Sequence, residues 1–210
     1  MSGLIGQKLG MTRLYDKTGK SVVTTVLQAG PCYVTEIRTK AKHGYDAVQI
    51  GFGVAREKVT PKPLLGHFKR AGLAPQRVLK EFDYSDLDTE LKLGAELKAD
   101  LFAEGDRVTV TGISKGRGFM GAVKRHHFAG GPRTHGQSDR HRAPGSLGQS
   151  SYPSRVYKGL RMAGRMGAEQ VSVRNLTIIK VDSARNLLFV KGAIPGHIKS
   201  FVFIRKQTAK

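Results

Sequence analysis

This 210-residue chain carries 36 lysines and arginines against 16 acids, a formal net charge of +20. Self-repulsion at this charge destabilises a compact protein unless a polyanion neutralises it, so a solitary enzyme is a poor match and a nucleic-acid partner a good one. The 39% hydrophobic content supports one core, or one core with a small lobe.

The single cysteine, Cys32, excludes an internal disulfide and a cysteine-based metal cluster. It lies in an apolar run, which indicates a buried structural thiol. No apolar stretch approaches the ~18 residues of a membrane span, and the first residues do not resemble a signal peptide. We therefore expect a cytosolic protein with no membrane partner.

The N-terminal quarter reads as four strands. Residues 9–15 and 22–28 flank a turn that ends in Gly19, which predicts a β-hairpin. Residues 32–38 and 47–52 are rich in Val, Ile, Tyr and Thr and predict two further strands.

Residues 54–75 change character, because three prolines interrupt them. Pro63 can begin a short helix that runs through Phe68 and Lys69 and ends at Gly72. A strand is predicted at 78–84. Residues 81–106 hold nine of the 16 acids, which indicates a face toward solvent or a protein neighbour. Their spacing does not match a calcium-binding loop.

Strand patterns resume at 108–113, where Val108, Val110 and Gly112 alternate with two threonines. They continue at 171–181, 187–191 and 201–204. A total of about eight strands with little helix favours a Greek-key barrel over a parallel sheet.

The most informative stretch is 115–165. It contains eleven lysines and arginines, one acid (Asp139), ten of the 26 glycines and four of the seven histidines. It has almost no aliphatic residues for a core. Such a segment suits an arm that enters a dense polyanion, of which folded RNA is the best candidate.

The run from Gly116 to Gly121 fits the dinucleotide fingerprint G-x-G-x-x-G. That fingerprint also needs a βαβ unit with an acid ending a second strand, and the single acid in range, Asp139, lies in a loop-like stretch. We interpret the glycines instead as a flexible exit from a strand into a short helix that carries Phe119, Ala122 and Val123 on one face.

The four histidines of this stretch suggest a metal site or a nuclease using His126, His127 and Asp139. Neighbouring arginines and lysines would repel a cation, and zinc sites need ligands at set spacing. Stacking on bases and bonding to phosphate is the more economical role. The cations are mostly Arg, whose forked contacts and stacking suit structured RNA. Tyr152 and Tyr157 either stack on bases or anchor the loop, and the sequence leaves both open.

Several motifs then resemble one family. They are GQKLGMT at 6–12, AGPC at 29–32, GHFK at 66–69, SKGRGF at 114–119, GSLGQ at 145–149, KG at 158–159, MAG at 162–164 and MG at 166–167. In this order they resemble the bacterial type of large-subunit ribosomal protein three, and the likeness runs from residue 3 to about residue 196.

The resemblance implies a mainly β protein: a six-stranded Greek-key barrel of the translation-protein type, an inserted small α+β lobe and a long basic, glycine-rich extension. The expected segments are barrel at 1–53, lobe at 54–95, barrel at 96–114, extension at 115–167 and barrel at 168–210. It further implies binding to large-subunit ribosomal RNA, support of early subunit assembly, and an arm that reaches toward the peptidyl-transferase region. In bacterial members the glutamine at the position of Gln149 can be N-methylated. The tryptophan that eukaryotic members carry at the arm tip is absent, so no role of that ring transfers.

We therefore expect a structural RNA-binding protein and no enzyme, with no cofactor and no metal. Its expected partners are the ribosomal RNA, neighbouring large-subunit proteins and a glutamine methyltransferase, without homo-oligomerisation. A soluble translation or RNA-remodelling factor is the alternative within the same fold. The residues predicted to contact RNA are Lys8, Lys115, Arg117, Lys124, Arg125, His126, His127, Arg133, His135, Arg140, His141, Arg142, Arg155, Lys158, Arg161 and Arg165.

Overall fold

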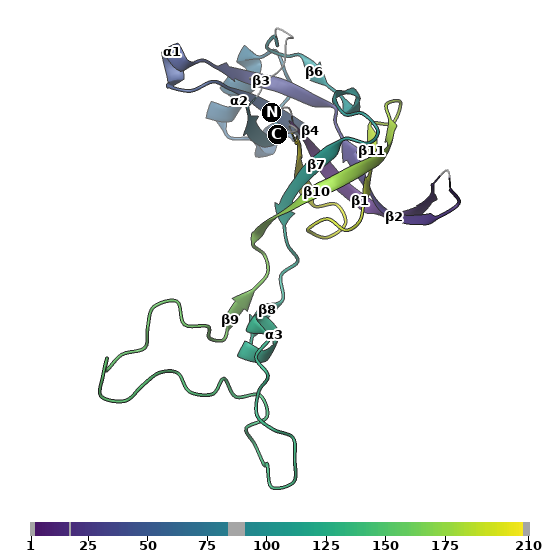
Figure 1. Cartoon of the computed structure of the whole chain (residues 1–210). Helices are drawn as coiled ribbons and strands as arrows, with labels where there is room; N and C mark the ends of the chain where they lie inside the picture. Colours follow the sequence, from purple (N-terminus) through teal and green to yellow (C-terminus); the bar gives the residue numbers. More distant parts are fainter. Residues whose placement is uncertain (1–2, 17, 84–90, 208–210) are drawn as a thin grey trace. The chain divides into compact units, whose positions relative to one another are not determined.

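The computed structural model describes residues 3–16, 18–83 and 91–207. Six antiparallel strands close a barrel in the order β1-β12-β7-β10-β11-β2 (Figure 1). The strands are β1 (Gly3–Tyr15), β2 (Ser21–Ala29), β7 (Arg107–Ile113), β10 (Gln170–Asp182), β11 (Leu187–Lys191) and β12 (Phe201–Lys206). The expected six-stranded barrel is thereby confirmed.

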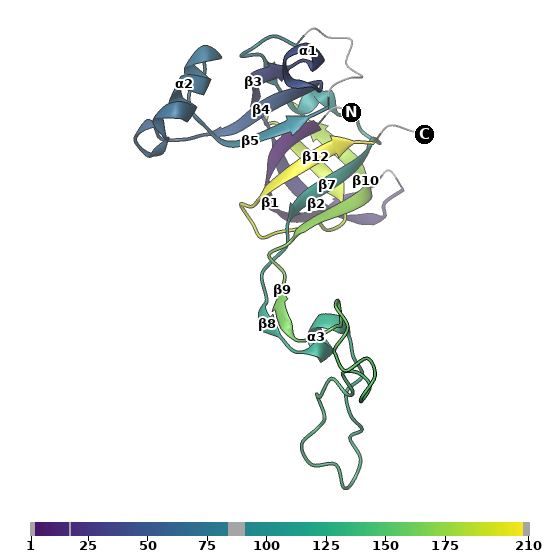
Figure 2. The ribbon, with the colours of Figure 1, turned by 90° about the vertical axis from the view of Figure 1, so that its left-hand side faces the viewer.

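Alternation along each strand builds the barrel interior. In β7, Val108, Val110 and Gly112 are buried and the threonines between them are half-buried, as the pattern predicts. Figure 2 shows β12, β7 and β10 side by side in the wall. The β1–β2 hairpin turns through Gly19, whose amide donates to the Asp16 carbonyl at 2.8 Å and whose φ is 77°.

A second, four-stranded sheet has the order β5-β4-β3-β6. It contains β3 (Cys32–Arg38), β4 (Ala47–Val54), β5 (Gln76–Phe82) and β6 (Glu96–Leu97). The predicted strands at 32–38 and 47–52 therefore exist, but they pair here and not in the barrel to which the sequence assigned them. The pattern of alternation identified strands correctly and could not identify their partners, because a partner is set by contacts distant in sequence. The five-segment division as a whole stays a prediction.

The barrel and the second sheet share one hydrophobic core. Buried barrel residues such as Leu4, Leu27 and Ile204 pack in the same cluster as Val34 and Ile50 of the second sheet. Cys32 is fully buried in that cluster, which agrees with the structural thiol expected from sequence.

The described residues between 40 and 101 also contain four short helical elements. They are α1 (Lys40–His43), η1 (Glu57–Val59), α2 (Lys62–Arg70) and η2 (Ala99–Leu101). The predicted helix with an early proline is α2, which buries Phe68 and begins one residue before Pro63. The predicted strand at 78–84 is β5, although Tyr84 lies outside the described residues, as do Asp86, Asp88 and Glu90.

Candidate nucleic-acid interface

Residues Ser114–Glu169 form a compact unit of their own, and we call this unit the arm. Its stem is a short antiparallel ladder of β8 (Gly118–Met120) and β9 (Gly164–Met166). The Ser114 amide donates to the Glu169 carbonyl at 2.9 Å, and the Arg117 amide donates to the Met166 carbonyl at 2.9 Å. Backbone hydrogen bonds therefore define the stem.

A five-residue helix, α3 (Ala122–His126), follows the first stem strand. The sequence placed Phe119 on this helix, and that was wrong: Phe119 pairs with Arg165 in the stem and is 78% exposed. Cross-strand hydrogen bonds hold residues 118–120 extended, which a local helical pattern does not reveal. The fingerprint 116–121 thus lies in a hairpin stem and not in a βαβ unit.

One carbonyl ties α3 to the returning chain. Arg125 donates from Nη1 to the Met162 carbonyl at 2.9 Å, and His126 Nε2 lies 3.0 Å from the same oxygen. A carbonyl only accepts, so His126 carries its proton on Nε2. His141 likewise donates from Nδ1 to the Pro132 carbonyl at 3.2 Å. These two histidines brace the backbone of the arm.

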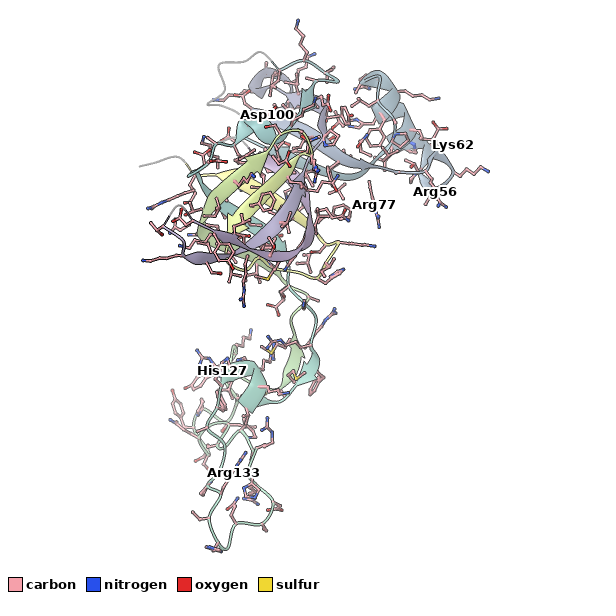
Figure 3. The ribbon with its side chains drawn as sticks, turned by 90° about the vertical axis from the view of Figure 1, so that its right-hand side faces the viewer. Arg56, Lys62, Arg77, Asp100, His127 and Arg133 are labelled. Carbon is pink, nitrogen blue, oxygen red and sulfur yellow. The ribbon has the colours of Figure 1, made fainter. Side chains whose placement is uncertain are left out.

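Most of the charge on the arm is exposed, and none of it is paired in a salt bridge. The residues of the arm, all of which the structure describes, contribute to no salt bridge. Side chains project from α3 and the loops, with His127 and Arg133 marked in Figure 3. Twelve predicted RNA contacts are exposed: Lys115, Arg117, Lys124, His127, Arg133, His135, Arg140, Arg142, Arg155, Lys158, Arg161 and Arg165. Arg125, His126 and His141 are half-buried.

The arm has almost no interior. Ala122 is the single buried residue among positions 114–169. The loop that spans 128–145 encloses an open hollow of about 530 Å³, lined by Phe128, the Gly130–Gly131 pair, Arg140 and Pro144 among others. Apolar burial therefore contributes little to the stability of this unit.

The arm also displays the residues that the sequence left open. Tyr152 is 84% exposed and Tyr157 is 56% exposed, so neither ring anchors a core, and both are available for stacking. Gln149 is exposed beside a turn in which Ser146 Oγ donates to the Gly148 carbonyl at 2.9 Å.

Lys8 departs from the predicted set. It is only 8% exposed, and its ammonium donates to the carbonyls of Ile194 at 2.9 Å and Gly196 at 3.1 Å. Its ammonium binds carbonyls within the compact unit that contains the barrel and the second sheet, which we call the barrel unit. Lys8 is therefore not among the residues proposed to contact phosphate.

A second cationic surface, which the sequence motifs do not indicate, lies outside the arm. Residues 54–77 around η1 and α2 carry six exposed cations and a single acid, Glu57. We call these cations the lobe surface: Arg56, Lys58, Lys62, Lys69, Arg70 and Arg77. None forms a salt bridge with any part of the chain that the structure describes. A charge count in a sliding window would have found this surface.

Metal-binding arrangements are not visible in the described ranges. Among residues 3–16, 18–83 and 91–207, no three His, Cys, Asp or Glu side chains gather as metal ligands. Within the same ranges no helix has the length and apolar character to cross a bilayer. The fold and the arm define a strongly basic β-barrel protein with unpaired cationic surfaces.

Comparison with known proteins identifies its family. The family model described as Ribosomal protein L3 matches residues 71–187. The chain is 54% identical to the large ribosomal subunit protein uL3 of Chlorobaculum tepidum, over 99% of this chain and 100% of the relative. The corresponding values are 53%, 97% and 98% for Chlorobium phaeobacteroides, and 54%, 99% and 100% for Chlorobaculum parvum. The chain belongs to the ribosomal protein L3 family.

This membership confirms the resemblance seen in the sequence motifs. It gives the chain a structural role in the large ribosomal subunit and no enzymatic one. The nuclease reading of His126, His127 and Asp139 is therefore wrong.

Proposed function

We propose that this structural protein binds large-subunit ribosomal RNA mainly through the arm. One observation carries the proposal: the arm contains eleven lysines and arginines but only one buried residue. Cations without internal partners gain most from a phosphate backbone, because binding releases condensed counterions. The proposed contacts are Lys115, Arg117, Lys124, Arg125, His126, His127, Arg133, His135, Arg140, His141, Arg142, Arg155, Lys158, Arg161 and Arg165.

RNA binding orders the arm. Fixing one residue costs about 1–2 kcal/mol of backbone entropy, and the arm buries too little apolar surface to offset this cost alone. Phosphates that surround the cations supply the missing free energy. Recognition follows RNA shape, with few contacts to base edges.

The family resemblance extends the proposal to assembly. The basic extension expected at 115–167, which makes up nearly all of the arm, reaches toward the peptidyl-transferase region, and the protein supports early assembly of the subunit in the cytoplasm. Neighbouring large-subunit proteins contact the barrel unit, and the protein does not form homo-oligomers. Gln149 is exposed, which suits modification by a glutamine methyltransferase.

Two variants of Arg140, one neutral and one charged, test the RNA contact. Arg140→Gln removes one exposed cation, whereas Arg140→Lys keeps the charge and removes the forked geometry. For binding to full-length large-subunit RNA, Arg140→Gln should lower the log–log salt slope by about 0.7–0.9, and Arg140→Lys should leave it unchanged. If the protein without substitutions binds the RNA with an affinity that does not depend on salt, the proposal is contradicted.

A further inference from the structure

A hollow of about 300 Å³ opens beside the junction of the barrel and the second sheet, which belong to the same compact unit. Its lining includes Gln28 of β2, Tyr33 of β3, Phe52 of β4, Arg77 of β5 and Phe201 of β12. With Gln7 of β1, which also lines the hollow, six strands from two sheets converge on one concave site, and none of these residues belongs to the arm.

Several of its polar groups lack a hydrogen-bond partner within the described residues. In the part of the chain that the structure describes, neither the side-chain amide of Gln28 nor the hydroxyl of Tyr33 forms a hydrogen bond. By contrast, the Gln7 amide donates to the Lys199 carbonyl at 3.0 Å. The Gln76 side-chain nitrogen donates to the Ala74 carbonyl at 3.0 Å, but its Oε1 is buried without a hydrogen-bond partner in the described residues. The Gln28 amide, which can both donate and accept, is thus free to hydrogen-bond the edge of a ligand.

Aromatic rings and a guanidinium form the rest of the site. Phe52 and Phe201 meet edge to face, with ring centroids 6.1 Å apart and an interplanar angle of 81°. Arg77 lies over the Phe201 ring, with Cζ 5.3 Å from the ring centroid. A planar guanidinium held on a ring offers a stacking surface and a phosphate-binding group at once.

The electrostatics select an anionic ligand. Arg77 is the single charged residue in the lining, which contains no acid. Figure 3 shows Arg77 beside the barrel, and Arg56 and Lys62 farther along the lobe surface that it shares. These cations form no salt bridge within the described residues, so they are available to a backbone of phosphates.

We propose that this hollow holds a single unstacked nucleobase of the large-subunit ribosomal RNA, with its phosphates on Arg77 and the adjoining lobe surface. The inference rests on the proposed RNA-binding function and adds a second contact, separate from the arm. Its volume is at the lower end for ligand pockets, which suits one base. The Gln28 amide hydrogen-bonds the edge of the base, and the ring-backed guanidinium stacks on its face.

Chemical probing of the complex tests this site. Full-length protein is bound to full-length large-subunit RNA, and base edges are probed with dimethyl sulfate and a carbodiimide. Two variants remove the free groups, Gln28→Leu and Tyr33→Phe. Tyr15→Phe is the matched control, because Tyr15 is 77% exposed and lies outside the hollow.

If the hollow holds a base, Gln28→Leu should weaken binding to large-subunit RNA about tenfold, the typical loss for one specific base contact. One nucleotide should regain its reactivity in Gln28→Leu and more weakly in Tyr33→Phe, while Tyr15→Phe matches the unmodified protein. Tyr33→Phe introduces no polar group or cavity, so it reports on the site even if Gln28→Leu folds poorly.

Three results would overturn the inference. If RNA binds with the arm's footprint intact but no base responds to either variant, the hollow does not hold a base and the proposed function survives. The same holds if the variants lose a neighbouring protein from assembled particles instead. If the unmodified protein fails to bind the RNA, the proposed function falls as well.

Discussion

The ammonium of Lys8 lies 2.9 Å from the carbonyl oxygen of Ile194, although 186 residues separate them. The Lys8 amide also donates to the Ser200 carbonyl, and the Lys199 amide donates to the Lys8 carbonyl. One residue thus fastens the loop between β11 and β12 to β1. Lys8, which the sequence predicts to contact RNA, instead hydrogen-bonds backbone carbonyls inside the fold.

Lys8→Met should destabilise the protein. The substitution keeps the apolar stem but leaves two carbonyls without their charged donor, at a cost of about 1–3 kcal/mol. Urea unfolding measures the change. Lys20→Met removes an exposed lysine and should alter stability by less than about 0.5 kcal/mol. Equal stabilities for the two variants would show that the Lys8 hydrogen bonds contribute nothing.

Local pattern predicted the strands, because burial alternates with every residue. Val108, Val110 and Gly112 were predicted to face one side, and the structure buries all three. The partners of each strand could not be predicted from this local pattern. Cys32 pairs with Phe52 and Leu97, and no local feature of 32–38 distinguishes those partners from a barrel strand.

The candidate interface was predictable where charge alone determines it. Arg133 and Arg140 are exposed and unpaired, as their glycine-rich surroundings indicate. Side chains that the fold recruits were not predictable. His126 bonds a carbonyl 36 residues away, and Lys8 bonds carbonyls from the far end of the chain. Such roles depend on tertiary contacts that composition does not record.

Removal of the arm should leave the barrel unit folded. Met120 pairs with Gly164, so replacing residues 121–163 with Asn-Gly closes the stem as a two-residue hairpin. No residue of 114–169 belongs to the hydrophobic core, so thermal unfolding of the barrel unit should change little. Ile204→Ala should create a cavity in that core and lower the free energy of unfolding by about 2–5 kcal/mol. A deletion variant that unfolds would show that the arm stabilises the barrel.

Gly167→Ala should open the stem. Gly167 has a φ of 74°, and an added Cβ would collide with the Lys115 carbonyl oxygen. Gly159 has a φ of 82° but open space around it, so Gly159→Ala carries the backbone strain without the collision. With RNA bound, exchange of the Arg117 amide should accelerate in Gly167→Ala and not in Gly159→Ala. Equal exchange in both would rule out the collision.

Cys32 should resist alkylation in the folded protein. Burial raises the pKa of its thiol from 9.0 to about 12, and the protonated thiol donates a hydrogen bond to the Ile5 carbonyl. The thiolate is the reactive form, so iodoacetamide at pH 8.5 should label Cys32 only after urea is added. Labelling of native protein at the rate of an unfolded thiol would contradict this.

The same shift makes stability depend on pH. The folded thiol keeps its proton between pH 9 and 12 while the unfolded one loses it, so this contribution is complete below pH 9 and disappears as pH rises toward 12. At pH 10.5 the unmodified protein should have lost about 2 kcal/mol more than Cys32→Ala, relative to pH 8. Parallel losses in the two proteins would place the thiol in contact with solvent.

Amide hydrogen exchange across residues 121–163 tests the central claim most directly, because it reports whether RNA orders the arm. In the free protein these amides should exchange rapidly while those of β7 and β10 stay protected. Binding of large-subunit RNA should slow them by orders of magnitude. Protection in the free protein equal to that of the barrel strands would contradict the account.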